Sequence, residues 1–273
     1  VEDLAADNVC YAELRYAPEQ HQADGLSLQQ IVEATVQGVK EGERLVAERG
    51  GRIHVRLILC AMRHAERSEE IAQLTVDNYG EHTPGEGYVV GFDIAGAEDG
   101  FPPSKHAAAF DLLRKNLVPF TVHAGEAAGV DSLRDALAQG ARRIGHGVRV
   151  YEDFNATMSG IELGPVARFM RDQRIALEIF CTVNTDNRLV SGTTMSREFE
   201  LLAEHCDLEL WQLLELTSND LQVAYCDEGL REDLERNVIY PAYAEVGNNL
   251  PDEALDASDA EGTEFSNGMQ RLH

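Results

Sequence analysis

The stretch PFTVHAGEAAG, residues 119–129, decides the fold, because an apolar run typical of a buried strand ends there on titratable side chains. His123 and Glu126 lie three positions apart, where the apolar residues give way to glycines. A strand end capped by a solvated charge would explain either residue alone. A β/α barrel explains both, because the carboxyl ends of its strands form the face that carries catalytic side chains.

The segments around this stretch alternate between strand and helix patterns. The expected strands are residues 8–18, 52–62, 88–96, 118–125 and 142–150, followed by the long apolar run 175–187. The expected helices are residues 27–50, 66–80, 105–116, 132–140 and 163–174. Ser27 with Gln30, and Ser132 with Asp135, have the spacing of helix caps. Strict alternation with apolar strands predicts a parallel sheet covered by helices, either a closed (β/α)₈ barrel or a doubly wound open sheet.

The run 175–187 helps to choose between these folds. It is too long for one ordinary strand, and two parallel strands would need a crossover of about a dozen residues between them. Counting it as two strands gives seven, one fewer than a closed barrel. We therefore expect an α/β fold, a (β/α)₈ TIM-type barrel, with a first strand before Val1 and a crossover between Ile179 and Phe180 both missing from the printed sequence. Residues 1–247 are expected to form one catalytic domain, and residues 248–273 an acidic, flexible tail.

Composition narrows the classes of partner. The 273 residues include 23 Lys and Arg against 48 Asp and Glu, a formal net charge of −25. Such a charge repels nucleic acid and anionic lipid, so neither is an expected partner. We see no membrane-spanning run or charged leader, and the five cysteines form no C-x-x-C pair, so a cytoplasmic protein with reduced thiols is expected.

Polar residues follow four consecutive expected strands. They are Asp93 and Gly96 in FDIAGAE, His123 and Glu126 in VHAGE, His146 in IGHGV, and Asp186 and Asn187 in VNTDN. One such residue would indicate only a structural histidine or a helix cap, but four instances together favour an active site. His123 and Asp186 offer the nitrogen and oxygen donors that zinc accepts. Burial of Glu126 in its Gly-Ala turn would raise its pKa and suit it to act as an acid.

These motifs carry a resemblance to a known family. YAELRYAP, GFDIAGAE, HAGE, RIGHG and NTDN occur in the order and at the strand ends typical of the adenosine deaminases of the metal-dependent amidohydrolase superfamily, which the chain resembles from Val1 to about Asn219. The resemblance implies a barrel with one zinc ion, bound by an H-x-H pair, by the histidine of HAGE and by the aspartate of NTD. His123 and Asp186 match the last two. The printed sequence contains no His-x-His pair, and the strand that would carry it is the one that the topology lacks.

The resemblance also implies a reaction, the hydrolysis of adenosine or 2′-deoxyadenosine to inosine and ammonia in purine salvage. Zinc would lower the pKa of water, and His146 and Asp186 would take the proton of that water. Glu126 would donate a hydrogen bond or proton to purine N1, and the backbone amide of Gly96 would meet N3. Asp93 would orient its neighbours.

One position departs from the family pattern. Many members have two adjacent aspartates where this chain has Asp186 and Asn187, but an amide can donate to purine N7 as a protonated carboxyl would. We see no basic cluster for a phosphate, so a nucleoside is the expected small-molecule substrate. Two alternatives stay open: a related metal-dependent hydrolase acting on another aminopurine or amide, and a barrel that binds a ligand without turnover. Oligomeric state is not predicted.

Overall fold

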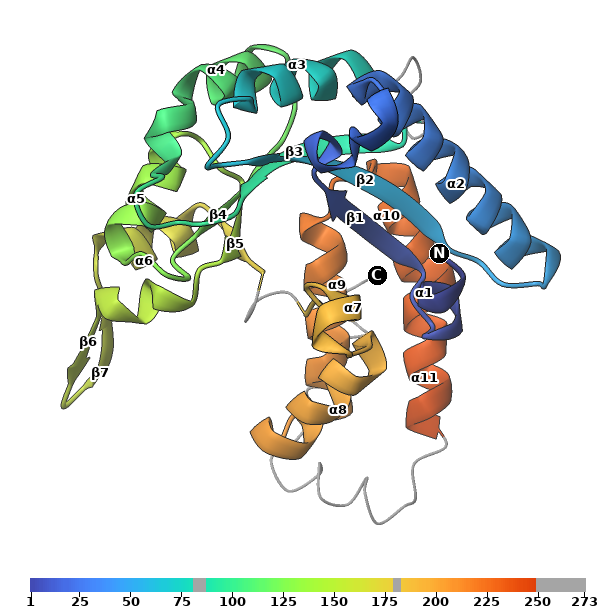
Figure 1. Cartoon of the computed structure of the whole chain (residues 1–273). Helices are drawn as coiled ribbons and strands as arrows, with labels where there is room; N and C mark the ends of the chain where they lie inside the picture. The colour runs from blue at the N-terminus through green and yellow to red at the C-terminus, as the bar shows by residue number, and fades with distance from the viewer. Residues whose placement is uncertain (81–86, 179–182, 249–273) are drawn as a thin grey trace.

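The centre of the fold is a curved parallel sheet, seen in a computed structural model that describes residues 1–80, 87–178 and 183–248 (Figure 1). Its strands are β1 (Tyr11–Tyr16), β2 (His54–Met62), β3 (Val89–Ala95), β4 (Thr121–Ala124), β5 (Arg143–His146) and β8 (Ala176–Leu177). They pair in parallel in the orders β1-β2-β3 and β4-β5-β8. A parallel bridge between Phe92 and Phe120 joins the two groups. This is the strand arrangement of a TIM-type barrel, as the alternation predicts.

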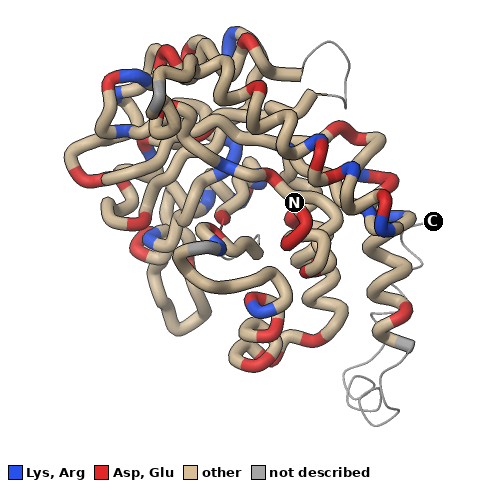
Figure 2. Tube along the Cα trace, turned by 45° about the vertical axis from the view of Figure 1, so that its right-hand side comes forward, with Lys and Arg blue, Asp and Glu red and all other residues tan. Residues whose placement is uncertain are grey.

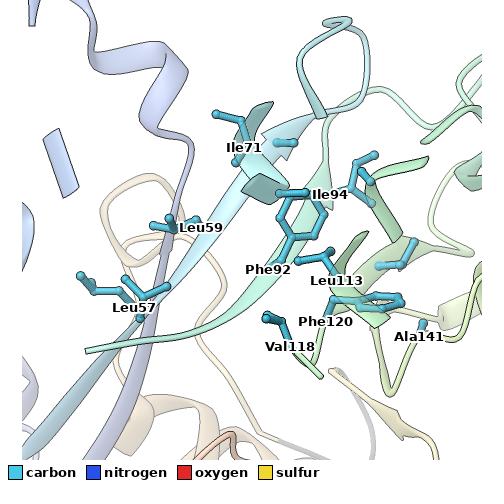
Figure 3. Packing of buried hydrophobic residues seen from close by; sticks show 14 of the residues in the cluster. Leu57, Leu59, Ile71, Phe92, Ile94, Leu113, Val118, Phe120 and Ala141 are labelled. Carbon is cyan, nitrogen blue, oxygen red and sulfur yellow. The ribbon is translucent and has the colours of Figure 1, made fainter. Parts of the chain in front are cut away.

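Helices that follow the strands cover the outer face of this sheet (Figure 1). They are α2 (Leu28–Glu48), α3 (Ser68–Asn78), α4 (Ala107–Lys115), α5 (Val130–Ala138) and α6 (Pro165–Asp172). The apolar core lies between these helices and the strands, where Leu57, Phe92 and Phe120 pack (Figure 3). Burying each side chain of this size contributes about 1.5–3 kcal/mol, so the outer face of the sheet is fixed by hydrophobic packing.

A second group of helices follows the sheet in sequence and lies below its β1 end in the view of Figure 1. It comprises α7 (Arg188–Ser191), α8 (Met195–Cys206), α9 (Leu210–Val223), α10 (Glu228–Leu234), the π-helical turn η5 (Glu235–Ile239) and α11 (Tyr240–Asn248). Leu221, Leu234 and Ile239 form a small core of their own there. The remaining short elements are α1 (Glu2–Ala6), η1 (Pro18–His21), η2 (Ala23–Gly25), η3 (Pro103–His106) and η4 (Val148–Asp153).

The two predicted helix caps have different outcomes. Ser27 is the N-cap of α2, and its side chain and that of Gln30 form both hydrogen bonds of a capping box. The prediction for Ser132 is wrong: α5 begins at Val130, after Gly129. The hydroxyl of Ser132 instead donates to a distant carboxylate, which is described with the site below.

One segment was misassigned from the sequence, and another was not predicted at all. Residues 183–187, expected to belong to a strand, have no strand structure. A hairpin of β6 (Phe154–Thr157) and β7 (Gly160–Leu163), which was not predicted, projects from the sheet (Figure 1). The expected break between Ile179 and Phe180, and the expected tail beyond residue 248, lie outside the described residues.

The distribution of charge agrees with the acidic composition. Acidic residues are spread around the chain rather than gathered on one face (Figure 2). Within the described ranges, no helix has the length and hydropathy that crossing a membrane requires.

Candidate active site

Four of the predicted site residues meet at the carboxyl ends of β3, β4 and β5. Asp93 is fully buried, and one of its carboxylate oxygens lies 3.0 Å from Nδ1 of His123. The rings of His123 and His146 meet edge to face, with centroids 5.1 Å apart. Nε2 of His146 lies 3.5 Å from a carboxylate oxygen of Glu126. The structure therefore places two imidazoles and two carboxylates in one chain of contacts.

Glycines make room for this cluster. Gly145 lies opposite His123 in the strand register, and a Cβ there would come within 2.7 Å of the imidazole. Gly96 follows β3 with a φ of +103°, which only glycine adopts easily, and a Cβ there would approach the Met62 side chain to 3.1 Å. Gly145 is therefore required because the His123 ring lies so close to it, and Gly96 is required by its backbone conformation.

Two predicted site residues have a backbone conformation that side chains rarely favour. His146 has a φ of 62° and Asp186 a φ of 45°, both in the left-handed region. Such conformations concentrate at active sites, where the surrounding structure holds them in place. At His146 the next residue, Gly147, donates its N–H to the carbonyl of Ala124 (2.9 Å), which fixes the turn at the end of β5.

A network of buried charges lies inside the barrel next to Asp93. Arg15, on β1, places Nη1 2.8 Å from Asp93 and donates from Nη2 to Glu178 (2.6 Å), just after β8. The same Nη1 atom lies 3.1 Å from Nε2 of His123. The guanidinium therefore joins the two edges of the described sheet to the cluster at the strand ends.

Arg143 continues this network along β5. Its guanidinium donates to Glu13 (2.7 Å) and to the Thr121 hydroxyl (3.2 Å), and lies 3.5 Å from Glu178. The ring of Tyr225 lies against the guanidinium, 3.7 Å from centroid to Cζ. Because buried charges need partners, these contacts hold β1, β5 and the segment after α9 together.

The charges shift the pKa of groups inside the network. Burial raises the pKa of the Glu178 carboxyl, but the guanidiniums of Arg15 and Arg143 outweigh it and hold that pKa at about 2. Burial raises the pKa of Tyr225 to about 12. Glu178 is therefore ionised and Tyr225 neutral at pH 7, which keeps the guanidiniums paired.

A second buried carboxylate, that of Glu98, holds the loop that carries Glu126. It accepts five hydrogen bonds, from the N–H groups of Gly125 (2.6 Å), Glu126 (3.1 Å), Ala127 (2.7 Å) and Ala128 (2.9 Å), and from the hydroxyl of Ser132 (2.5 Å). Burial raises the pKa of Glu98, but these donors lower it below its ordinary value. Glu98 is thus an ionised anchor for residues 125–128.

The side chain of Glu126 itself faces solvent. It is 61% exposed, so the predicted burial of this carboxyl is wrong for the described structure. The Gly-Ala turn is anchored through its backbone amides, which leaves the side chain outside.

Asp186 and Asn187 lie in a separate turn after the described end of β8, and both are exposed. Asn184 links this turn to the sheet, because its amide donates to the Glu178 carbonyl (2.6 Å) and its oxygen accepts from Asp186 N–H (3.0 Å). Asn187 is the N-cap of α7, and its side-chain oxygen accepts from the N–H of Val190 (3.1 Å). That cap uses the oxygen of the amide and not its NH₂ group.

The chemistry of a metal can be tested against these donors. His123 and Asp186 are of types that zinc accepts, but over residues 1–80, 87–178 and 183–248 no group of three His, Cys, Asp or Glu side chains is arranged to hold an ion. The structure brings Asp93, His123, His146 and Glu126 together, and it does not bring Asp186 into such a group. The described residues therefore include donors of the types that zinc accepts, but they do not form a complete set of zinc ligands.

Several residues of this site were missed from the sequence. Glu13, Arg15 and Arg143 lie on strands, where a charged residue at one position does not show whether it faces the barrel interior or solvent. Glu178 comes directly after β8 and gives no clearer signal. Glu98 stands within GFDIAGAE, but its partners are 27 to 34 positions away along the chain. The alternation of Glu13 and Arg15 on one face of β1 was the available signal.

A parallel α/β barrel with imidazoles and carboxylates at its strand ends is the arrangement of a TIM-type barrel enzyme, whose catalytic side chains stand at that face. A sequence profile described as Adenosine deaminase matches residues 1–182. The chain is 43% identical over 274 residues to adenosine deaminase 1 of Streptomyces coelicolor. The aligned region covers 90% of this chain and 68% of that protein. The chain therefore belongs to the adenosine deaminase family and is a hydrolase.

Solved structures share the fold at lower identity. An amidohydrolase from Burkholderia ambifaria with bound zinc superposes with a TM-score of 0.73 at 20% identity, over 90% of this chain and 71% of that one. The N6-methyl-AMP deaminase of Arabidopsis thaliana superposes with a TM-score of 0.69 at 22% identity, over 89% and 76%. Both comparisons place this chain in the same barrel fold, and membership of the family implies a metal cofactor.

Proposed function

We propose that this protein deaminates adenosine, by zinc-dependent hydrolysis, to inosine and ammonia. The observation that carries the proposal is the contact chain Asp93–His123–His146–Glu126 at the strand ends of a chain 43% identical to a named adenosine deaminase. The contacts proposed below all engage the purine base. We therefore expect 2′-deoxyadenosine to be accepted as well, and assign the protein to purine salvage in the cytoplasm.

The metal in this proposal is zinc, with His123 and Asp186 as two of its ligands. When bound, zinc makes water a stronger acid and so supplies a nucleophile near neutral pH. Asp93, 3.0 Å from Nδ1 of His123, would fix the orientation of the imidazole and leave its Nε2 to the metal. The contact between Arg15 and that Nε2 would then give way to the ion.

The protein's own acid and base would move the protons. His146 would accept a proton from the attacking water, and Glu126 would donate one to purine N1 so that negative charge does not build up in the ring. Their side chains are 3.5 Å apart, so both lie at the same end of the barrel. His146 would then pass its proton to the 6-amino group, which leaves C6 as ammonia, and the hydroxyl on C6 would return a proton to Glu126.

Two further contacts would hold the purine. The amide N–H of Gly96 would meet N3, where the absence of a Cβ and the positive φ leave the backbone accessible. The NH₂ group of Asn187 would donate to N7, since the oxygen of that amide is used by the cap of α7. These donors recognise an aminopurine rather than its sugar.

The function is tested by metal content together with an absorbance assay. Protein loaded with zinc and freed of excess ion should convert adenosine to inosine, and chelation should abolish the activity. AMP, added in parallel, should be a much poorer substrate. A protein that binds zinc and turns over only another aminopurine or an amide would support the related-hydrolase alternative, and ligand binding without turnover would support the non-catalytic one.

A further inference from the structure

Glu98 is a buried residue that binds the loop carrying Glu126. Its carboxylate is 6% exposed and accepts five hydrogen bonds, although a carboxylate offers only about four lone-pair positions. Four of the donors are consecutive backbone N–H groups, those of residues 125–128. The charge at Glu98 therefore specifies the backbone conformation of the whole segment.

Arg149 binds two carbonyls of this segment, those of Gly125 (2.9 Å) and Ala127 (2.8 Å), whereas the segment's four N–H groups all donate to Glu98. The segment lies between β4 and α5, it begins with Gly125 at a φ of +73°, and it carries the exposed side chain of Glu126. The direction in which that side chain leaves the backbone is set by the backbone itself. The carboxylate that binds the N–H groups of this loop therefore helps to set the direction of the acid of the proposed reaction.

We propose that Glu98 is a positioning residue, which aims Glu126 at the substrate by binding the amides of residues 125–128. This inference rests on the proposed function. It predicts that Glu98 acts on turnover through Glu126, and not on the binding of metal or purine.

An isosteric change separates this role from simple packing. Glu98→Gln keeps the size and shape of the side chain but replaces one oxygen with an NH₂ group, which cannot accept from an amide. Oε1 accepts two hydrogen bonds and Oε2 three, so at least two of the five bonds are lost in either orientation. Asp99→Asn is the matched control, because Asp99 is exposed and lines the same cavity of about 210 Å³ beside Glu98.

The kinetic test compares these variants with adenosine as substrate. Misplacing a catalytic group by about 1 Å costs about 10²-fold in rate, so Glu98→Gln should lower kcat by that order with KM and zinc content little changed. Asp99→Asn should match the unaltered protein. In a Glu126→Gln background, Glu98→Gln should cause no further loss, because the group that it positions is already gone. An additive loss, or an unchanged kcat in Glu98→Gln, would overturn the proposal.

Hydrogen exchange of the amides of residues 125–128 gives a readout that does not depend on activity. Exchange there should be faster in Glu98→Gln than in Asp99→Asn, and unchanged exchange would contradict the anchoring role. Ser132→Ala is the milder second variant, since it removes one donor, keeps the charge and should show smaller effects in the same direction. Failure of the unaltered zinc protein to deaminate adenosine would refute the proposed function instead, because that result involves no change at Glu98.

Discussion

Replacing Arg143 by methionine removes the cation at the centre of the buried network without opening a large cavity. The side chain of Arg143 is 8% exposed, and its loss removes the 2.7 Å ion pair with Glu13 and one of the two guanidinium contacts of Glu178 among the described residues. Breaking a buried ion pair by removing one partner costs about 3–5 kcal/mol, because a charge remains buried and uncompensated. The lost contact with Tyr225 adds to that cost.

Urea unfolding measures this loss. For a domain of this size the slope of the unfolding free energy against urea is about 3 kcal/mol per molar, so the midpoint should fall by about 1–2 M with the slope unchanged. Arg44→Met is the control, because Arg44 also pairs with two glutamates but is 52% exposed. Exposed pairs contribute about 0–1 kcal/mol, so that control should shift the midpoint by less than about 0.4 M.

A second substitution tests the physical reason. Glu13→Gln in the Arg143→Met background removes the uncompensated charge, so the double variant should be less destabilised than the sum of the single changes. The reasoning is refuted if Arg143→Met shifts the midpoint no more than Arg44→Met does.

Two further predictions concern the turn after β8 and the helix that contacts it. Asn187→Leu should weaken the binding of adenosine but hardly affect 7-deazaadenosine, which lacks the acceptor at that position; equal losses for both ligands would show that Asn187 acts by packing. Burial raises the pKa of Asp220, which accepts the N–H of Val183, to about 8. Because the folded protein binds this proton more tightly than the unfolded chain does, the protonated carboxyl stabilises the fold at low pH, and that stabilisation is lost as pH rises. The unfolding free energy should therefore fall between about pH 4 and 8, by at most about 1.4 kcal/mol per pH unit. Asp220→Asn should flatten this slope relative to the unaltered protein, and an identical slope in urea titrations at pH 5 and 8 would contradict the assignment.

The sequence predicted the strands and outer helices well because their signals are local. Ser27 and Gln30 are three residues apart and form the expected cap, and the apolar run at β2 is buried along nearly its whole length. The same spacing failed at Ser132, because Ser132 lies inside the first turn of α5 and its hydroxyl donates to Glu98. Local spacing cannot reveal a partner 34 positions away.

The site was predicted in part for a related reason. His123, His146 and Asp93 were found because all three stand at strand ends, which parallel pairing brings to one edge. The network of Arg15, Arg143 and Glu178 was not found, because charges on a strand or directly after it look alike in sequence whether they pair inside a barrel or face water. The β6–β7 hairpin was missed because its four-residue strands are too short to show a clear alternation.

The turnover of adenosine by Glu126→Gln, measured with zinc-loaded protein, tests the central claim most directly. Glutamine keeps the size of the side chain but cannot donate a proton from a carboxyl group, and lost acid–base catalysis costs about 10²–10⁴-fold. The account predicts a fall of that size in kcat with zinc content unchanged, while Glu162→Gln, the same change on the exposed hairpin strand β7, should have no effect. Near-normal turnover in Glu126→Gln would contradict the account.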